Sequence, residues 1–351
     1  MDKENKDLRE INTNDFFKLS LPEDKIKFLL GYAILAPSTH NSQPWLFKIG
    51  ENFCEVYYER KKLLPQADPK GRDLYISLGC AIENLVIAAK YFNVFQKADY
   101  GPFREENLVA KIYFSFVGAR QNTVRKELES LLSAIPRRIN ARGIFKDKPV
   151  DSEIKDLIFT NIKQEDYYLD DLETKFVEQK DKIREIASLS SKGIRIAYQN
   201  PLFRKEMSDW LRSSFTSKKD GLPGYALKMP AILSLIFPTI VRFGDVGKFL
   251  SGLNEKSVSS APMVCVISAR GDNPLTWFLV GRLAERLMLE FNKHSYDTSI
   301  FVAAIEMGEL YKNLQSIIGT TLTPQFLFAV GKIDTLHKPT PRHSIESKMI
   351  K

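Results

Sequence analysis

The chain has 351 residues, of which 44% are hydrophobic, enough to bury a substantial core as one large domain or two modest ones. Its formal net charge is +8, but the 51 Lys and Arg residues are interleaved with 43 Asp and Glu residues. The absence of a basic run argues against nucleic-acid binding, and a basic balance also suits an anionic small-molecule substrate. The three cysteines lie far apart without a CxxC or Cys/His cluster, which argues against disulfides and a metal site and favours a reducing cytoplasm.

The ends of the chain and its apolar stretches give no sign of a membrane span. The first ten residues are dense in charge and lack the apolar region of a signal peptide. The longest apolar stretch, residues 231–241, contains Pro238 and is far shorter than the ~20 residues that cross a bilayer. We interpret it as a buried lid or core segment; the alternative is a segment that lies against a membrane surface.

A polar loop follows the first apolar helical run, residues 28–35. Its sequence, A-P-S-T-H-N-S-Q-P-W over residues 36–45, places prolines at both ends of a cluster of hydrogen-bonding groups. Such a loop is restrained and can present amides, a hydroxyl and a carboxamide to a planar ligand, although a purely structural turn has the same composition.

Short strands are expected at 45–49, 53–58, 108–117, 165–170, 262–269 and 325–331. Residues 77–92 and 276–292 form two long apolar helices, whose wide apolar faces predict central core positions. Residues 79–87 can be laid over 281–289 with Gly, Glu and Leu coinciding, which indicates an internal repeat. No strand is followed by GxGxxG, so a dinucleotide-binding Rossmann domain is not supported.

The openings of the two halves differ in charge. Residues 9–16 begin with Arg9 but otherwise lack cations, whereas R-R-I-N-A-R-G-I-F over residues 137–145 carries three. Arg138, Asn140 and Arg142 alternate, so in an extended segment they would project to the same side as a phosphate cradle. The alternative is a solvated basic turn.

The loop P-S-x-x-N-x-Q-P-W resembles the flavin-contacting loop of the nitroreductase superfamily, and R-R-x-N-x-R is similar to that family's phosphate-binding segment. The D-P-x-G-R run at 68–72 and T-P-R-H at 340–343 look like the fused, twin-domain, Acg-like branch. The first half keeps the loop and the second half keeps the cations, so one composite site is expected. The resemblance implies an α+β fold of two pseudo-repeated antiparallel sheets flanked by helices, arranged as an intramolecular dimer.

The resemblance also assigns residues. It implies FMN bound by the loop, by the basic segment, by A-I-E-M at 304–307, which is similar to the family's P-I-E-G, and by a C-terminal cation. Arg138 and Arg342 should be partly exposed at the ligand, and no side chain need act as a strong acid or base. The cofactor-binding candidates are Pro37, Ser38, Asn41, Arg138, Asn140, Arg142, Ile305, Glu306 and Arg342.

Two functions follow from the resemblance. The first is an FMN-dependent oxidoreductase that takes hydride from NAD(P)H and reduces a nitroaromatic or quinone-like acceptor. The alternative is an FMN-storing or sequestering protein with little turnover. Residues 1–120 would form the first half and 121–351 the second, with 190–252 as a lid insertion. A fused chain supplies its own dimer partner, so a monomer or a homodimer is expected.

Overall fold

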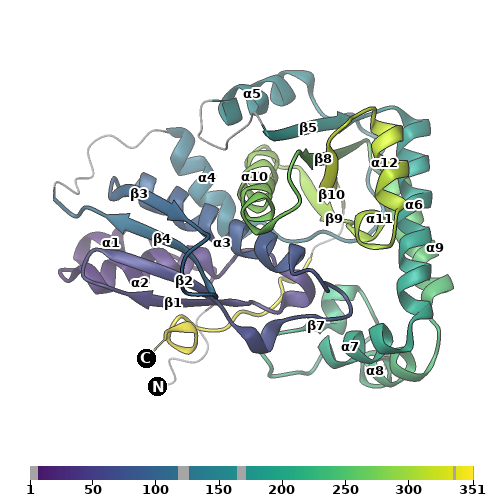
Figure 1. The fold of residues 1–351 in the computed structure, drawn as a ribbon, viewed down its shortest axis with the longest axis horizontal. Helices are drawn as coiled ribbons and strands as arrows, with labels where there is room; N and C mark the ends of the chain where they lie inside the picture. The colour runs from purple at the N-terminus through teal and green to yellow at the C-terminus, as the bar shows by residue number, and fades with distance from the viewer. Residues whose placement is uncertain (1–6, 118–125, 164–170, 335–336, 351) are drawn as a thin grey trace.

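In the computed structural model, residues 7–117, 126–163, 171–334 and 337–350 are described. The first sheet consists of β1 (Trp45–Ile49), β2 (Phe53–Tyr58), β3 (Phe95–Tyr100) and β4 (Leu108–Phe114). Its antiparallel strands follow the spatial order β1-β2-β4-β3, and β1 and β2 form a hairpin in which Phe47 pairs with Val56. The buried positions of these strands face the helices of the first half, where the core forms (Figure 1).

The second sheet repeats this topology. It consists of β5 (Leu172–Val177), β8 (Met263–Ala269), β9 (Asp297–Ile300) and β10 (Thr323–Gly331), in the antiparallel order β5-β8-β10-β9. In both sheets the order is first, second, fourth, third, and a long helix connects the second strand to the third. The predicted α+β fold with two antiparallel sheets is therefore confirmed.

The strand predictions differ from the structure in detail. The ranges 45–49 and 53–58 agree with β1 and β2, and the ranges 108–117, 262–269 and 325–331 overlap β4, β8 and β10. Strands β3, β5 and β9 were not predicted. Of these, β3 and β9 are short strands that leave a long helix through a turn, and neither has a clear apolar alternation. The strand expected at 165–170 and the half boundary at 120–121 lie outside the described residues.

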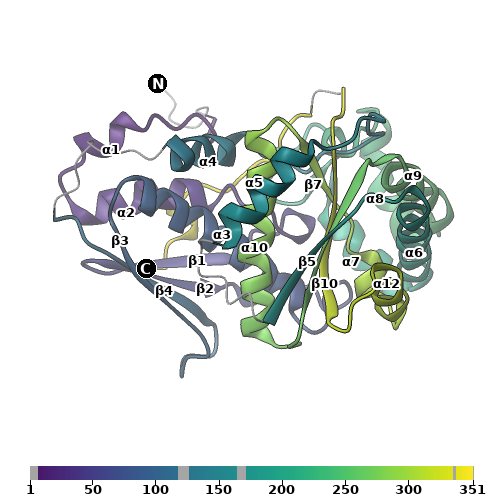
Figure 2. The same ribbon diagram turned by 90° about the horizontal axis from the view of Figure 1, so that it is seen from above.

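Helices α3 (Arg72–Tyr91) and α10 (Pro274–Lys293) cross at the centre of the molecule, between the two sheets (Figure 2). Asn273 caps α10 by accepting a hydrogen bond from the Thr276 amide at 3.1 Å. Gly79 and Gly281, which coincide in the repeat, meet at the crossing: a Cβ on either would lie 2.1 Å from a backbone oxygen of the other helix. Both helices are almost wholly buried, as predicted. Helix α3 is long and apolar enough to cross a membrane, but 83% of its apolar window is buried inside the molecule.

The two halves differ most in the connection between their first and second strands. A short turn joins β1 to β2, whereas an insertion that contains four helices joins β5 to β8. Helices α6 and α9 run alongside each other, and α7 and α8 form a separate lobe (Figure 1). The lobe also holds the parallel pair β6 (Leu211–Arg212) and β7 (Leu222–Pro223). The four helices are α6 (Lys180–Gln199), α7 (Pro201–Trp210), α8 (Leu233–Phe243) and α9 (Gly247–Ser260).

The expectation that residues 231–241 are buried is wrong for most of the segment. In α8 only Ser234, Phe237 and Val241 are buried. The remaining helices flank the two sheets: α1 (Asn14–Lys18), α2 (Pro22–Ala33), α4 (Lys126–Arg137), α5 (Ser152–Lys163), α11 (Ala303–Glu306) and α12 (Leu310–Ile318).

The C-terminal tail, residues 337–350, returns to the first half of the chain (Figure 1). Ile350 donates its amide to the Phe47 carbonyl at 2.8 Å, beside β1. The Lys348 ammonium donates to the Gln43 carbonyl at 2.7 Å and pairs with Glu59 at 3.1 Å. The tail thereby joins the end of the second half to the polar loop of the first.

Candidate functional site

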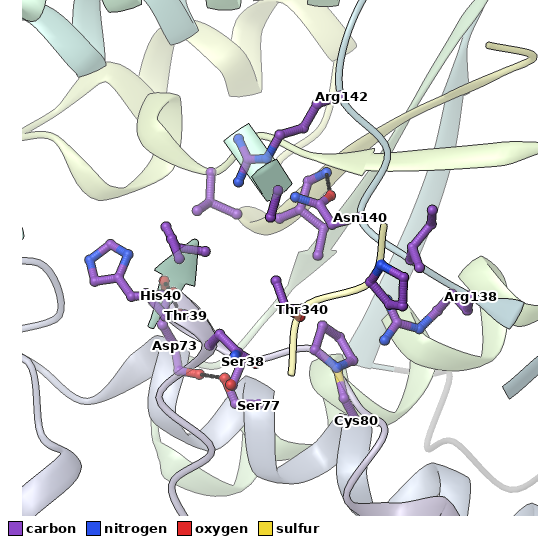
Figure 3. Close-up of a pocket in the computed structure, with 18 of the residues that line it drawn as sticks. Ser38, Thr39, His40, Asp73, Ser77, Cys80, Arg138, Asn140, Arg142 and Thr340 are labelled. Carbon is purple, nitrogen blue, oxygen red and sulfur yellow. Dashed lines mark hydrogen bonds between the residues drawn. The ribbon is translucent and has the colours of Figure 1, made fainter. Parts of the chain in front are cut away.

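Segments from both halves enclose one cavity of about 270 Å³ (Figure 3). Its wall combines the polar loop, the N-terminal part of α3, the basic segment 138–142, the β5–β8 insertion and the tail. Eight of the nine residues proposed from the sequence line it: Pro37, Ser38, Asn41, Arg138, Asn140, Arg142, Glu306 and Arg342. Ile305 does not; its side chain is buried in the core of the second half.

The polar loop is held in an unusual backbone conformation. His40, Asn41 and Gln43 all have φ between +53° and +56°, a region that non-glycine residues adopt uncommonly. The Ser38 hydroxyl accepts the Gln43 amide at 3.0 Å, which closes the loop. The Gln43 side chain donates to the Lys219 carbonyl at 2.7 Å and accepts the His343 amide at 2.9 Å. Contacts with the insertion and the tail therefore fix the loop.

The Asn41 carboxamide is engaged by the protein itself. Its Nδ2 donates to the Pro341 and Gly221 carbonyls, at 3.1 and 3.2 Å, and its Oδ1 accepts from Arg342 at 2.7 Å. The side chain is 4% exposed. Asn41 thus acts in this arrangement by holding the tail arginine in place.

Three arginines converge at one end of the cavity. Arg138 pairs through Nε with Glu285 at 3.0 Å, and Arg342 donates to the Leu35 and Ala36 carbonyls at the end of the first apolar helical run. Arg9 donates to the Pro136 and Arg138 carbonyls at 2.6 and 3.1 Å. Arg138 and Arg342 are 2% and 8% exposed, so the expectation that both would be partly exposed is wrong.

This arginine cluster (Arg9, Arg138 and Arg342) carries surplus positive charge. Burial and the neighbouring Arg138 lower the pKa of Arg9 to about 10. Burial, together with Arg9 and Arg138, holds the pKa of Arg342 well below its usual value. Asp7 and Glu285 oppose this effect on Arg9, Glu285 opposes it on Arg342, and Arg342 Nε is buried without a hydrogen-bond partner. Three guanidiniums against these two carboxylates leave a net positive charge, and such a site is suited to an anion.

Asn140 and Arg142 do not join the cluster. Asn140 accepts the Ile300 amide at 2.8 Å, and the adjoining Ala141 amide donates to the Thr298 carbonyl, so this segment is attached along β9. Arg142 points to a different part of the cavity from Arg138 (Figure 3). The three side chains, expected to project to the same side as one phosphate cradle, therefore do not form it: Asn140 is bound to β9, and Arg142 lies apart from Arg138.

Arg142 is a guanidinium without a partner in the part of the chain that the structure describes: no hydrogen bond or ion pair is formed by its side chain. Burial lowers its pKa. The His40 Nε2 atom is also buried without a hydrogen bond, and burial lowers the pKa of His40 to about 4. The loop histidine is therefore neutral at neutral pH.

A carboxyl pair lines the wall near the loop. Asp73, at the start of α3, accepts from Thr39 Oγ1 at 3.2 Å and from Arg72 at 3.2 Å. Glu306, at the end of α11, is hydrogen-bonded to Asp73, and burial and Asp73 hold the pKa of Glu306 well above its usual range. Arg72 and the hydrogen bonds to Asp73 lower the pKa of Asp73 against the opposing effect of burial. Arg72 also lies 3.8 Å from Glu306, which opposes the rise in the pKa of Glu306, so of the two carboxyls Glu306 is the one that binds a proton more readily.

Several lining residues were not predicted from the sequence. Arg9 was noted as the remaining cation of the first half, and its place in the repeat is a signal that could have identified it. Asp73 directly follows the D-P-x-G-R run, but nothing in the sequence marks a role for it. Phe203, Tyr225 and Lys228 are among those that come from the insertion, and nothing in their spacing indicates a cavity.

No protein-family model matches the chain. It is 21% identical over 336 residues to the putative NAD(P)H nitroreductase Acg of Mycobacterium tuberculosis H37Rv, which covers 92% of this chain and 94% of the relative. It is 27% identical over 127 residues to the putative NAD(P)H nitroreductase Rv3131 of the same organism, so that match spans 36% of each protein.

Solved structures were compared as well. The FMN-dependent nitroreductase NfnB of Mycobacterium smegmatis, in complex with NADPH, aligns with a TM-score of 0.42 and 14% identity. This alignment covers 62% of the present chain and 96% of NfnB.

Proposed function

We propose that this chain, a member of the twin-domain, Acg-like branch of the nitroreductase superfamily, binds FMN and passes hydride from NAD(P)H to an electron-poor acceptor. The similarity to Acg over nearly the whole chain confirms the resemblance found in the motifs. The acceptor class we propose is nitroaromatic or quinone-like. The observation that carries the proposal is the arginine cluster, with its surplus charge and the unpartnered Arg342 Nε.

The residues present fit the cofactor. The phosphate would lie at the arginine cluster, where it would balance the surplus charge and give Arg342 Nε an acceptor. The ring system would lie toward the polar loop and α3, and Asn41 would hold Arg342 rather than contact the ring. Bound FMN supplies the hydride transfer in this scheme.

The protein's own groups then have separate tasks. The unpartnered guanidinium of Arg142 would stabilise negative charge that develops in the cavity during reduction. Glu306, whose pKa burial and Asp73 raise, would be the carboxyl of the pair that exchanges a proton with a ligand in the cavity. Ser38 closes the loop through the Gln43 amide, which fixes the loop backbone before any ligand binds. Orientation and electrostatics are therefore the contribution of this chain.

We further propose the organisation in which residues 1–120 supply the loop, residues 121–351 supply most of the cations, and the insertion covers the cavity. Phe203, Leu222 and Tyr225 of the insertion line the wall. This cover favours the second candidate function, FMN storage or sequestration, because it restricts access by a nicotinamide.

Binding of FMN and riboflavin tests the phosphate site, since riboflavin lacks only the phosphate. Fluorescence titration should show much tighter binding of FMN. Arg9→Met should weaken FMN binding and leave riboflavin binding unchanged, because Arg9 contacts only carbonyls and its loss leaves no carboxylate unpaired. Arg270→Met, at an exposed surface ion pair with Asp171, is the matched control. Equal affinity of the wild type for both ligands would remove the cluster from the cofactor site.

Anaerobic absorbance spectra separate the two functions. Flavin bands that bleach after addition of NADPH or NADH would establish a reductase. Bands that persist with both nicotinamides would support storage.

A further inference from the structure

The outer face of α8 is an exposed apolar surface. We define it by five side chains, Ile232, Leu235, Ile236, Ile240 and Phe243, all of which are exposed. At 100° per residue they fall on one side of the helix, with Thr239 as the polar residue among them. Ile232 and Phe243, at its ends, are 80% and 78% exposed.

The opposite side of α8 anchors it in the lobe. Phe237 and Val241 belong to a buried cluster that includes residues of α6 and α7, and the Ser234 hydroxyl accepts the Ser214 amide at 2.8 Å. The outer face is therefore presented in a fixed orientation. Single exposed apolar residues are ordinary, but a continuous apolar face indicates an interaction surface.

The charges around α8 indicate what the face contacts. The 24 residues 221–244 contain no Asp or Glu, and their two charged residues are Lys228 and Arg242. Arg242 pairs with Asp209 at the edge of the helix, and Asp220 and Asp245 flank the segment. Over the whole lobe, residues 201–243, seven Lys and Arg residues stand against three Asp and Glu residues, so the lobe is net positive. A second copy of this chain would bring like charges together across the interface, whereas an anionic surface would attract them.

We propose that the outer face of α8 docks on an anionic lipid bilayer, with the helix lying in the plane of the membrane interface. An apolar helical face on a lobe of net positive charge is the pattern that binds such an interface. The inference does not depend on the proposed function. Leu222, Tyr225 and Lys228 of the preceding segment line the cavity, so docking would take place beside the cavity's cover.

Sedimentation with lipid vesicles tests the proposal on the full chain. The wild type should sediment with phosphatidylcholine vesicles that contain phosphatidylglycerol, and less with phosphatidylcholine alone or at high salt. Ile236→Glu and Phe243→Glu should each lose this binding, because each places a charge on the docking face. Leu157→Glu, a matched change at an exposed leucine of α5, should keep it. Circular dichroism and thermal unfolding check that all three variants fold as the wild type does.

Two results would overturn the proposal. One is a wild type that remains in the supernatant with both kinds of vesicle. The other is equal binding by Ile236→Glu, Phe243→Glu and Leu157→Glu. Sedimentation velocity would reveal the competing occupant: a dimer that Ile236→Glu dissociates, together with no vesicle binding, would assign the face to a second copy.

Discussion

Helices α3 and α10 hold equivalent places in the two halves, but only α3 borders the cavity. The sequence alignment of the two halves that places Gly79 over Gly281 also places the lining residues of α3 over bulkier residues of α10. Asp73, Ile76, Ser77 and Cys80 correspond to Leu275, Phe278, Leu279 and Arg282. The larger side chains fill the space on the α10 side, where the Phe278 ring lies 5.0 Å from the Tyr100 ring and the Arg282 guanidinium lies over it at 5.1 Å.

Two equivalent glutamates show the same divergence. Glu285 of α10 pairs with Arg138, which faces the cavity, whereas Glu83 of α3 pairs with Arg282 at 3.0 Å. In the repeat, Glu83 and Glu285 coincide. Equivalent buried carboxylates therefore pair with different arginines. Glu285 pairs with Arg138, which lines the cavity, and Glu83 pairs with Arg282, which fills the corresponding space on the α10 side. This divergence supports the proposal of one composite site, at the cavity beside α3.

The largest expected effect comes from breaking the pair that serves the cavity. Arg138→Met leaves Glu285 buried without its cation, and removal of one partner of a buried ion pair costs about 3–5 kcal/mol. Urea unfolding should show a loss of this size. For this reason a variant at Arg138 tests folding together with ligand binding, and Arg9 is the better position for the phosphate test.

Glu285→Gln in the Arg138→Met background provides the control. Burial already raises the pKa of Glu285, and the neutral amide of Gln removes the buried charge that Arg138→Met leaves without a partner. The double variant should recover a large part of the lost stability. If it is as unstable as Arg138→Met, the cost does not arise from the unpaired carboxylate.

The sequence was sufficient for some of these features and insufficient for others. The polar loop, the basic segment and the repeat predicted a composite site because they are local motifs with fixed spacing. The directions in which the Arg138 and Arg142 side chains point could not be predicted. They depend on the hydrogen bond from the Ile300 amide to Asn140, a contact between residues 160 positions apart in the sequence. The exposure of α8 was missed for a related reason: an apolar segment indicates burial, and the surface it docks on is not part of the chain.

The polar loop has no counterpart in the second half, and acid should weaken it. Burial lowers the pKa of His40 to about 4, from about 6.5 in an unfolded chain. The folded state therefore resists protonation of His40, and the contribution of the neutral imidazole to the free energy of unfolding is lost as the pH falls from 6.5 to 4. At about 1.4 kcal/mol per pKa unit, the loss amounts to at most about 3 kcal/mol.

His40→Asn isolates this contribution, because Asn tolerates the positive φ of the position. The free energy of unfolding, measured in urea at pH 7 and pH 4, should fall less for His40→Asn than for the wild type. An identical fall in both proteins would mean that His40 is protonated equally easily in the folded and unfolded states.

The helix crossing, which both halves share, should be sensitive to one methyl group. In Gly281→Ala the new Cβ would meet the Ile76 carbonyl oxygen at 2.1 Å, so α3 and α10 must move apart. Overpacking of this kind costs about 1–3 kcal/mol, which exceeds or offsets the helix propensity gained from alanine. Gly79→Ala should behave alike, since its Cβ would meet the Phe278 carbonyl oxygen. Thermal unfolding that is unchanged in both variants would contradict the close approach.

Gly252→Ala should have the opposite and smallest effect, and it separates the packing of the crossing from the general cost of glycine in a helix. Gly252 lies inside α9, and a Cβ there would meet no atom within 4 Å. Only the backbone entropy of glycine remains, so alanine should stabilise the protein by about 0.5–1 kcal/mol. Urea unfolding of the three glycine variants side by side should therefore give losses at positions 79 and 281 and a gain at 252. A loss at 252 as well would show that α9 is constrained by a contact on its outer side, and the destabilisation at the crossing could then no longer be ascribed to the approach of α3 and α10 alone.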